Sequence, residues 1–147
     1  MKLMIDTNVL LDVLLDREPY ADDSAMIWRL CEAEETEGCI SSLSFANMVY
    51  VLRKKINKES IMHMITDLSL IFKFEALQQK DLYTAAGCLW DDFEDAIQFA
   101  TAVRINADYI ITRNKKDYQG STVPVMTPKE FLASYKEITC NKYDKTV

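Results

Sequence analysis

Short apolar runs alternate with longer segments in which apolar residues recur at helical spacing. The apolar runs predict strands at residues 3–6, 39–41, 72–76, 109–112 and 123–126. The intervening segments predict helices at residues 7–15, 21–35, 44–55, 60–70, 80–88 and 92–106, and a last helix from residue 127. Alternating strands and helices are typical of α/β proteins. We therefore expect a central parallel sheet of about four or five strands with helices on both faces.

The length of the chain suits one domain with a hydrophobic core of its own. At 147 residues it is most simply a single domain, which we place at residues 1–134. Residues 135–147 are polar, and this predicts a C-terminal tail that frays. Pro124 suits an edge strand, and Pro128 suits the first position of the last helix.

Composition and charge restrict the classes of function. The formal net charge is −6, so no overall positive field attracts nucleic acid, and a polyanion must bind through local patches or metal ions. No apolar stretch approaches the ~20 residues of a membrane span, and Asp6 interrupts the first apolar run too early for a signal peptide. The four cysteines show no metal-ligand spacing and indicate reduced thiols, so we expect a cytoplasmic protein without a membrane association.

Acidic and amide side chains recur where predicted strands end or helices begin. Asp6 and Asn8 follow the first strand, residues 112–114 (Thr-Arg-Asn) follow a later one, and Asp92 and Asp95 share a face at the start of a helix. In parallel sheets ligands bind beyond the carboxyl ends of the strands. Clustered carboxylates repel one another unless a cation intervenes, and Mg²⁺ prefers oxygen ligands. The pattern predicts an acidic Mg²⁺ or Mn²⁺ pocket that acts on a phosphodiester.

Each acid also has a purely structural explanation. Asp92 is a good N-cap, Asp6 is able to cap the next helix, and Asp117 suits a turn. The recurrence of such groups at three element ends favours a site over three independent caps. Other chemistries find less support, because the chain has only three glycines, no nucleophile elbow and a single histidine, His63. A ribonuclease that uses a pair of histidines is excluded.

Four motifs in order resemble those of PIN-domain proteins. They are IDTNV at residues 5–9, DFEDAIQFA at 92–100, ADYIITRNKKDY at 107–118 and VMTPKEFL at 125–132. The resemblance covers roughly residues 2–133, and the last motif is similar to the ending of the bacterial branch that includes VapC-type toxin ribonucleases. DTN alone is a weak signal, whereas the ordered set is specific. The resemblance implies a single-domain PIN-like fold with a parallel sheet.

The resemblance also implies roles for individual residues. Asp6 and Asp95 match the metal ligands, with Asp92 and Asp117 assisting them as further metal-binding and catalytic acids. Residues matched to the positioning of water or phosphate are Asn8, Asn47, Thr112 and Asn114. Arg113, Lys115 and Lys116 flank the carboxyl edge of the sheet, where we expect them to contact the RNA backbone.

Two positions depart from the family pattern. Asn47 stands where the family often has glutamate, and Asn114 stands where it often has aspartate. Each amide keeps an oxygen but removes a negative charge, so we expect weaker metal binding. Asp117, three residues after Asn114, offers a compensating carboxylate.

The resemblance implies a metal-dependent endoribonuclease that cleaves single-stranded or structured RNA, as the toxin of a toxin–antitoxin pair. Two alternatives remain open: a catalytically lapsed PIN domain that binds RNA or protein, and a structural partner in a complex. The implied partners are an antitoxin and a second copy of the chain. Apolar residues on more than one face of the helices at residues 21–35 and 44–56 agree with a homodimer.

Overall fold

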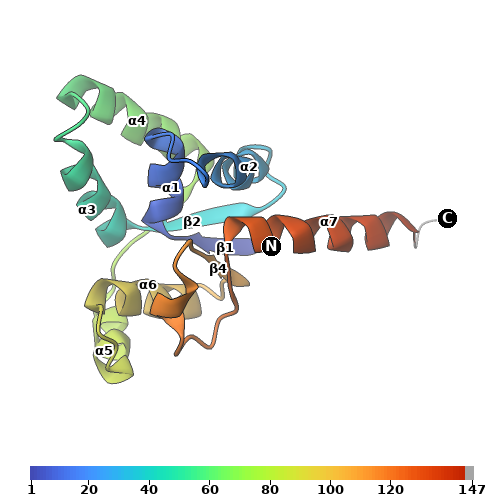
Figure 1. The fold of residues 1–147 in the computed structure, drawn as a ribbon. Helices are drawn as coiled ribbons and strands as arrows, with labels where there is room; N and C mark the ends of the chain where they lie inside the picture. Colours follow the sequence, from blue (N-terminus) through green and yellow to red (C-terminus); the bar gives the residue numbers. More distant parts are fainter. Residues whose placement is uncertain (145–147) are drawn as a thin grey trace.

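A five-stranded parallel sheet forms the centre of the molecule in a computed structural model that describes residues 1–144 and the side chains of residues 1–141 (Figure 1). The strand order is β3-β2-β1-β4-β5, and every neighbouring pair is parallel. The strands are β1 (Lys2–Ile5), β2 (Glu37–Ser41), β3 (Lys73–Glu75), β4 (Tyr109–Ile111) and β5 (Val125–Met126). The predicted α/β architecture is confirmed, and β5, which follows Pro124, lies at the sheet edge as predicted.

Helices cover both faces of the sheet. They are α1 (Thr7–Leu14), α2 (Ala21–Glu32), α3 (Ser42–Leu52), α4 (Lys58–Ile71), α5 (Gln79–Cys88), α6 (Phe93–Arg104) and α7 (Pro128–Asp144). In β1, Leu3 and Ile5 pack into the core cluster beneath α1 to α4, whereas Met4 packs into the cluster with Phe99 of α6. Figure 1 shows α1 to α4 on one side of the sheet and α5 and α6 on the other. Among the described residues, no helix is both long and apolar enough to span a membrane.

Two helices, α1 and α3, begin directly at the carboxyl end of a strand, and polar residues cap several helices. Ser41 at the end of β2 accepts a hydrogen bond from the backbone N–H of Ser44, so Ser41 is the cap of α3. Asn57 caps α4 in the same way. The junctions of β1 with α1 and of β2 with α3 turn the chain from the sheet into a covering helix and leave the side chains there at the carboxyl edge.

The last helix is longer than the sequence suggests. α7 continues past Ser134 to Asp144, within the segment 135–147 that its polarity predicts to fray. Its extension has tertiary support: the ring of Tyr135 stacks on buried Phe131 at 5.8 Å between centroids, and its hydroxyl donates to Glu35 Oε2 at 2.8 Å. Residues 145–147 lie outside the described part of the chain. Polar composition alone does not reveal this contact with Glu35, which follows α2, and the boundary between a domain at 1–134 and a frayed tail stays a prediction.

Candidate active site

Asp6 and Asn8 lie where β1 passes into α1. Asp6 Oδ2 accepts hydrogen bonds from the Thr112 hydroxyl at 2.7 Å and from Asn8 Nδ2 at 3.3 Å. Asp6 occupies the N-cap position of α1, yet its side chain makes no capping hydrogen bond. Asp6 thus marks the start of α1, while its carboxylate belongs to a cluster that joins the ends of β1 and β4.

Asp92 and Asp95 lie at the start of α6. Asp92 Oδ1 accepts the backbone N–H of Asp95 at 3.0 Å, so the structural explanation of Asp92 as an N-cap is confirmed. This cap orients the first turn of α6. Asp95 is half-buried and directs its carboxylate toward the end of β1.

The hydroxyl of Tyr118 connects the two principal acids. It lies 3.3 Å from Asp6 Oδ2 and 3.2 Å from Asp95 Oδ1, and it also accepts a hydrogen bond from Gln98 Nε2. Tyr118 is 2 % exposed and ends the short 3-10 helix η1 (Lys115–Tyr118), while Gln98 comes from α6. The sequence interpretation missed both residues. The signal in the sequence was a tyrosine directly after the candidate acid Asp117. If such a tyrosine is buried, its hydroxyl normally requires a polar partner, and the neighbouring acids offer one.

The pKa values of Asp6, Asp95 and Tyr118 are raised above their ordinary values. Burial, followed by the negative charges of Asp92 and Asp6, raises the pKa of Asp95 to about 7. Burial also raises the pKa of Asp6 and that of the Tyr118 phenol. Within residues 1–141 no lysine or arginine forms an ion pair with Asp6, Asp92 or Asp95. A hydroxyl has one proton and cannot donate fully to two carboxylates at once, so the pair needs an additional proton or a cation.

We expect the free energy of unfolding of the metal-free protein to fall as the pH rises from about 4 to about 7. The variant Asp95→Asn, which lacks the titrating carboxyl group, should show a smaller fall. The folded state keeps the Asp95 proton up to a pKa of about 7, whereas the unfolded chain releases it near its ordinary value of 3.8. The contribution of this proton to folding is therefore complete below the ordinary pKa and is lost as the pH passes through the raised one. Thermal unfolding in EDTA across this range measures it. Parallel stability curves for the two proteins would contradict the raised pKa.

The two amides that depart from the family pattern contact different elements. Asn47 of α3 donates through Nδ2 to Glu94 Oε2 at 2.7 Å, which places a carboxylate of α6 beside it. Glu94 is a third residue that the sequence interpretation missed, since its contact spans the gap between two helices. Asn114 is exposed, and its backbone N–H donates to the Thr112 hydroxyl at 3.1 Å.

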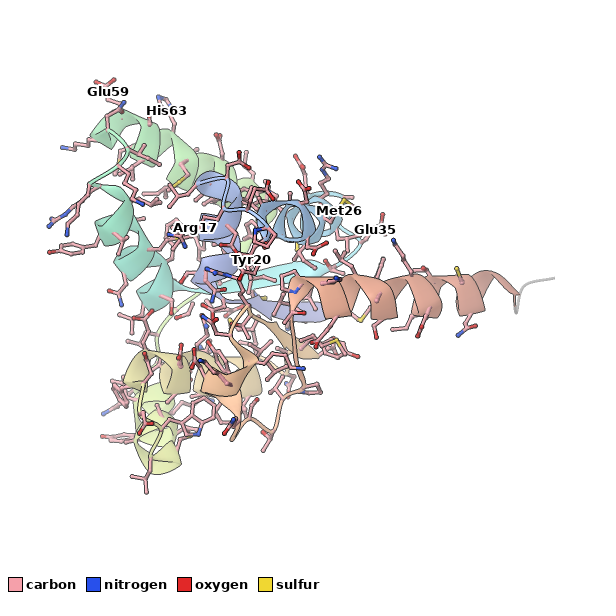
Figure 2. The ribbon with its side chains drawn as sticks, viewed as in Figure 1. Arg17, Tyr20, Met26, Glu35, Glu59 and His63 are labelled. Carbon is pink, nitrogen blue, oxygen red and sulfur yellow. The ribbon has the colours of Figure 1, made fainter. Side chains whose placement is uncertain are left out.

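The predicted acids converge only in part. Asp92 and Asp117 line one pocket of about 260 Å³ together with Lys116 and the ring of Trp90. Asp117 lies near enough to Asp95 to contribute to its raised pKa. Among the described residues, no three acidic, histidine or cysteine side chains come together as a ready-made metal-binding group. His63 is exposed on α4, away from α6, and takes no part in the cluster (Figure 2).

Two of the three predicted RNA-contacting cations form ion pairs within the protein. Arg113 Nε lies 3.1 Å from Asp12 Oδ2, and Lys115 Nζ lies 3.1 Å from Glu130 Oε2. In the described part of the chain Lys116 forms no ion pair, and it lies on the wall of the pocket with Asp92 and Asp117. Among the three predicted cations, Lys116 is therefore the one that no ion pair with a described residue keeps from contacting a phosphate.

The order of the strands and the acids at their carboxyl ends agree with a known family. A family model described as PIN domain matches residues 2–116. The chain belongs to the PIN-domain family, as the sequence motifs predict. No curated protein matches the chain.

Solved structures share the fold at low sequence identity. The VapBC2 complex of Rickettsia felis bound to promoter DNA matches with a TM-score of 0.66 and 17% identity over 86% of this chain and 98% of that chain. A toxin–antitoxin complex from Klebsiella pneumoniae matches with a TM-score of 0.65 and 24% identity over 86% and 97%. VapC20 of Mycobacterium tuberculosis, a toxin that cleaves the sarcin–ricin loop, matches with a TM-score of 0.59 and 14% identity over 74% and 86%. These similarities establish the shared fold.

Proposed function

We propose that this PIN-domain protein is a metal-dependent endoribonuclease that cleaves single-stranded or structured RNA, and that it is the toxin of a toxin–antitoxin pair. The observation that carries the proposal is the convergence of Asp6 and Asp95 on one buried hydroxyl, while no lysine or arginine within residues 1–141 forms an ion pair with either acid. Membership of the PIN-domain family and the fold shared with an RNA-cleaving toxin support the same chemistry.

The donor set fits a hard divalent cation. Mg²⁺ binds in proteins through one or two carboxylates together with waters and substrate phosphates, and Mn²⁺ accepts similar oxygen ligands. Asp6 and Asp95 would hold one or two such ions, with Asp92 and Asp117 assisting. The raised pKa values of Asp6 and Asp95 support this assignment, because the cluster lacks the positive charge that would stabilise two ionised carboxylates.

A bound Mg²⁺ or Mn²⁺ would supply charge stabilisation for the phosphoryl group and activation of a water molecule. The protein's own residues prepare the site. Thr112 and Asn8 hold the Asp6 carboxylate in one orientation by donating to the same oxygen. Tyr118 fixes Asp95 relative to Asp6, and the amides of Asn47 and Asn114 would orient water or phosphate. Lys116 would contact the RNA backbone.

The direct test is cleavage of single-stranded and looped RNA by the purified protein with Mn²⁺ or Mg²⁺, against an EDTA control. Cleavage that requires the metal supports the proposal. RNA binding without cleavage would favour the alternative of a lapsed PIN domain that acts as a binding module. The amides Asn47 and Asn114, which replace acids common in the family, are the observation behind that alternative.

An antitoxin and a second copy of the chain are the protein partners that we propose. The similar structures include toxin–antitoxin complexes, which supports the first partner. Exposed apolar side chains on α2 and α3 support the second: Met26 is 40% exposed, Tyr50 is 58% exposed and Val51 is 48% exposed. Figure 2 shows Met26 at the outer side of α2. A cytoplasmic location remains a prediction.

Restoring the two family acids should tighten metal binding. We expect the double variant Asn47→Glu/Asn114→Asp to bind Mn²⁺ about tenfold more tightly in calorimetry, because ligand charge controls affinity at oxygen-rich sites. Asn47→Glu alone would set a second carboxylate against Glu94, where the amide now donates at 2.7 Å, so its metal-free form should be less stable.

The matched control for the double variant is Asn106→Asp, which adds a charge at an exposed position in the turn between α6 and β4. It should leave Mn²⁺ affinity unchanged. An equal affinity for the double variant and the wild type would contradict the placement of Asn47 and Asn114 at the metal site.

A further inference from the structure

We propose that a pocket between the start of α2 and the start of α7 receives one unpaired base of the RNA substrate. The pocket has a volume of about 280 Å³, and its walls include Pro19, Tyr20, Arg113 and Pro128. This inference rests on the proposed ribonuclease function, and it adds to the phosphodiester site a neighbouring place where a base would be bound.

The inner wall of the pocket carries buried polar groups. Asp12 and Ser24 line the pocket, and both are 0% exposed. Within the described residues the Ser24 hydroxyl has no hydrogen-bond partner. A buried hydroxyl without a partner is costly, unless a ligand or water supplies one. Such a group gives a bound base a hydrogen-bonding contact that apolar walls alone would lack.

The outer wall is a stacking surface. The Arg113 guanidinium lies over the Tyr20 ring at 4.3 Å from its centroid, and Arg113 Nε is held 3.1 Å from Asp12 Oδ2. Unpaired bases are commonly recognised by stacking on aromatic rings and on guanidinium planes. Tyr20 is 42% exposed, so its ring is accessible to such a base. In Figure 2, Tyr20 lies between α2 and the beginning of α7.

The charge of the lining favours a base over an isolated phosphate. The acids Asp12 and Asp23 are balanced by Arg113 and Lys129. A pocket with no net charge, with proline and aromatic walls, offers an anion little electrostatic attraction. It suits instead a flat, uncharged ring with polar edges.

The pocket is directly connected to the candidate active site. The backbone N–H of Arg113 donates to Asn8 Oδ1 at 3.5 Å, while its side chain reaches Asp12. Asn8 and Asp12 are one turn apart on α1, a rise of about 6 Å. Arg113 also directly follows Thr112, which holds Asp6. A strand with one phosphate at Asp6 and Asp95 would therefore bring an adjacent base to the pocket.

Fluorescence anisotropy with labelled single-stranded RNA of about eight nucleotides tests the inference. Binding is measured in EDTA, which stops metal-dependent cleavage, with a normal probe and with a probe that lacks bases. Tyr20→Ala should weaken binding of the normal probe about tenfold and leave binding of the abasic probe unchanged, because only the stacking contact is lost. Tyr20→Phe, which keeps the ring, should bind as the wild type does.

Two further variants complete the design. Tyr83→Ala removes a 69% exposed tyrosine on α5 and should leave binding of both probes unchanged. Ser24→Ala should change the relative affinity for probes of different base composition without weakening binding of the abasic probe. If Tyr20→Ala does not fold, as judged by circular dichroism, the result for Ser24→Ala alone decides whether the pocket binds a base.

Several results would overturn the inference. They are equal losses for the normal and abasic probes with Tyr20→Ala, an unchanged base preference with Ser24→Ala, or no binding of the normal probe by the wild type. Free nucleoside monophosphates could also compete with the probe. If they bind as tightly as the oligonucleotide does, the pocket is a site for free nucleotides, and the inference is overturned. Because this experiment omits metal, its failure leaves the nuclease proposal standing, and a failed cleavage assay leaves the base pocket testable.

Discussion

Replacing Asp6 or Asp95 by asparagine is expected to reduce metal-dependent RNA cleavage by at least about a thousandfold. Each change removes one of the two carboxylates that meet at the Tyr118 hydroxyl, and with it the charge that would hold a divalent cation. The fold should persist, because an amide retains the shape of the side chain. Burial raises the pKa of both acids, so their loss relieves an unfavourable charge at neutral pH.

The measurement is the initial rate of RNA cleavage with saturating Mn²⁺, together with thermal unfolding in EDTA. The control is Asp22→Asn, which removes an equal charge from the exposed first turn of α2. It should cleave RNA at the wild-type rate. Wild-type turnover by Asp6→Asn or Asp95→Asn would contradict the assignment of the active site to this edge of the sheet.

Arg104→Met is expected to lower the free energy of unfolding by about 3–5 kcal/mol, the largest stability change that we predict. Arg104 Nε and one terminal nitrogen bind the two oxygens of Asp81 at 2.9 and 3.1 Å, and that terminal nitrogen also donates to the Ala76 carbonyl at 2.8 Å. Asp81 is 1% exposed, so removal of the arginine leaves a buried carboxylate without its counter-charge. The pair ties α5 to α6, the helix that positions Asp95.

Chemical denaturation with urea measures this change. The matched control is Arg29→Met, since Arg29 also lies in the last turn of its helix but is exposed, donates a hydrogen bond to Met26 Sδ at 3.6 Å and forms no ion pair with the described residues. Its effect should stay within about 0.5 kcal/mol. Similar losses for the two variants would show that the ion pair between α5 and α6 contributes little beyond a surface charge.

The sequence by itself determined the order of strands and helices, because apolar periodicity is a local property that neighbouring residues decide. It also placed Asp6, Asp95 and Thr112 at element ends, which the parallel topology then gathers at one edge. The PIN-family motifs were recognisable for the same reason, since each is a short contiguous segment. The expected roles of these residues in metal and RNA binding are still to be tested.

Only the tertiary structure decided which side chains meet. Tyr118 reaches Asp6 across 112 residues, Asn47 reaches Glu94 across 47, and Arg113 turns away from the acids to pair with Asp12. The hydrogen bond from the Tyr135 hydroxyl to Glu35 likewise spans 100 residues and supports the first turns of α7. Contacts of this range depend on how the helices pack on the sheet and on which buried charges lack a partner. The packing and electrostatic energies of such contacts arise between segments that are distant in the sequence, so no local pattern in the sequence reports them.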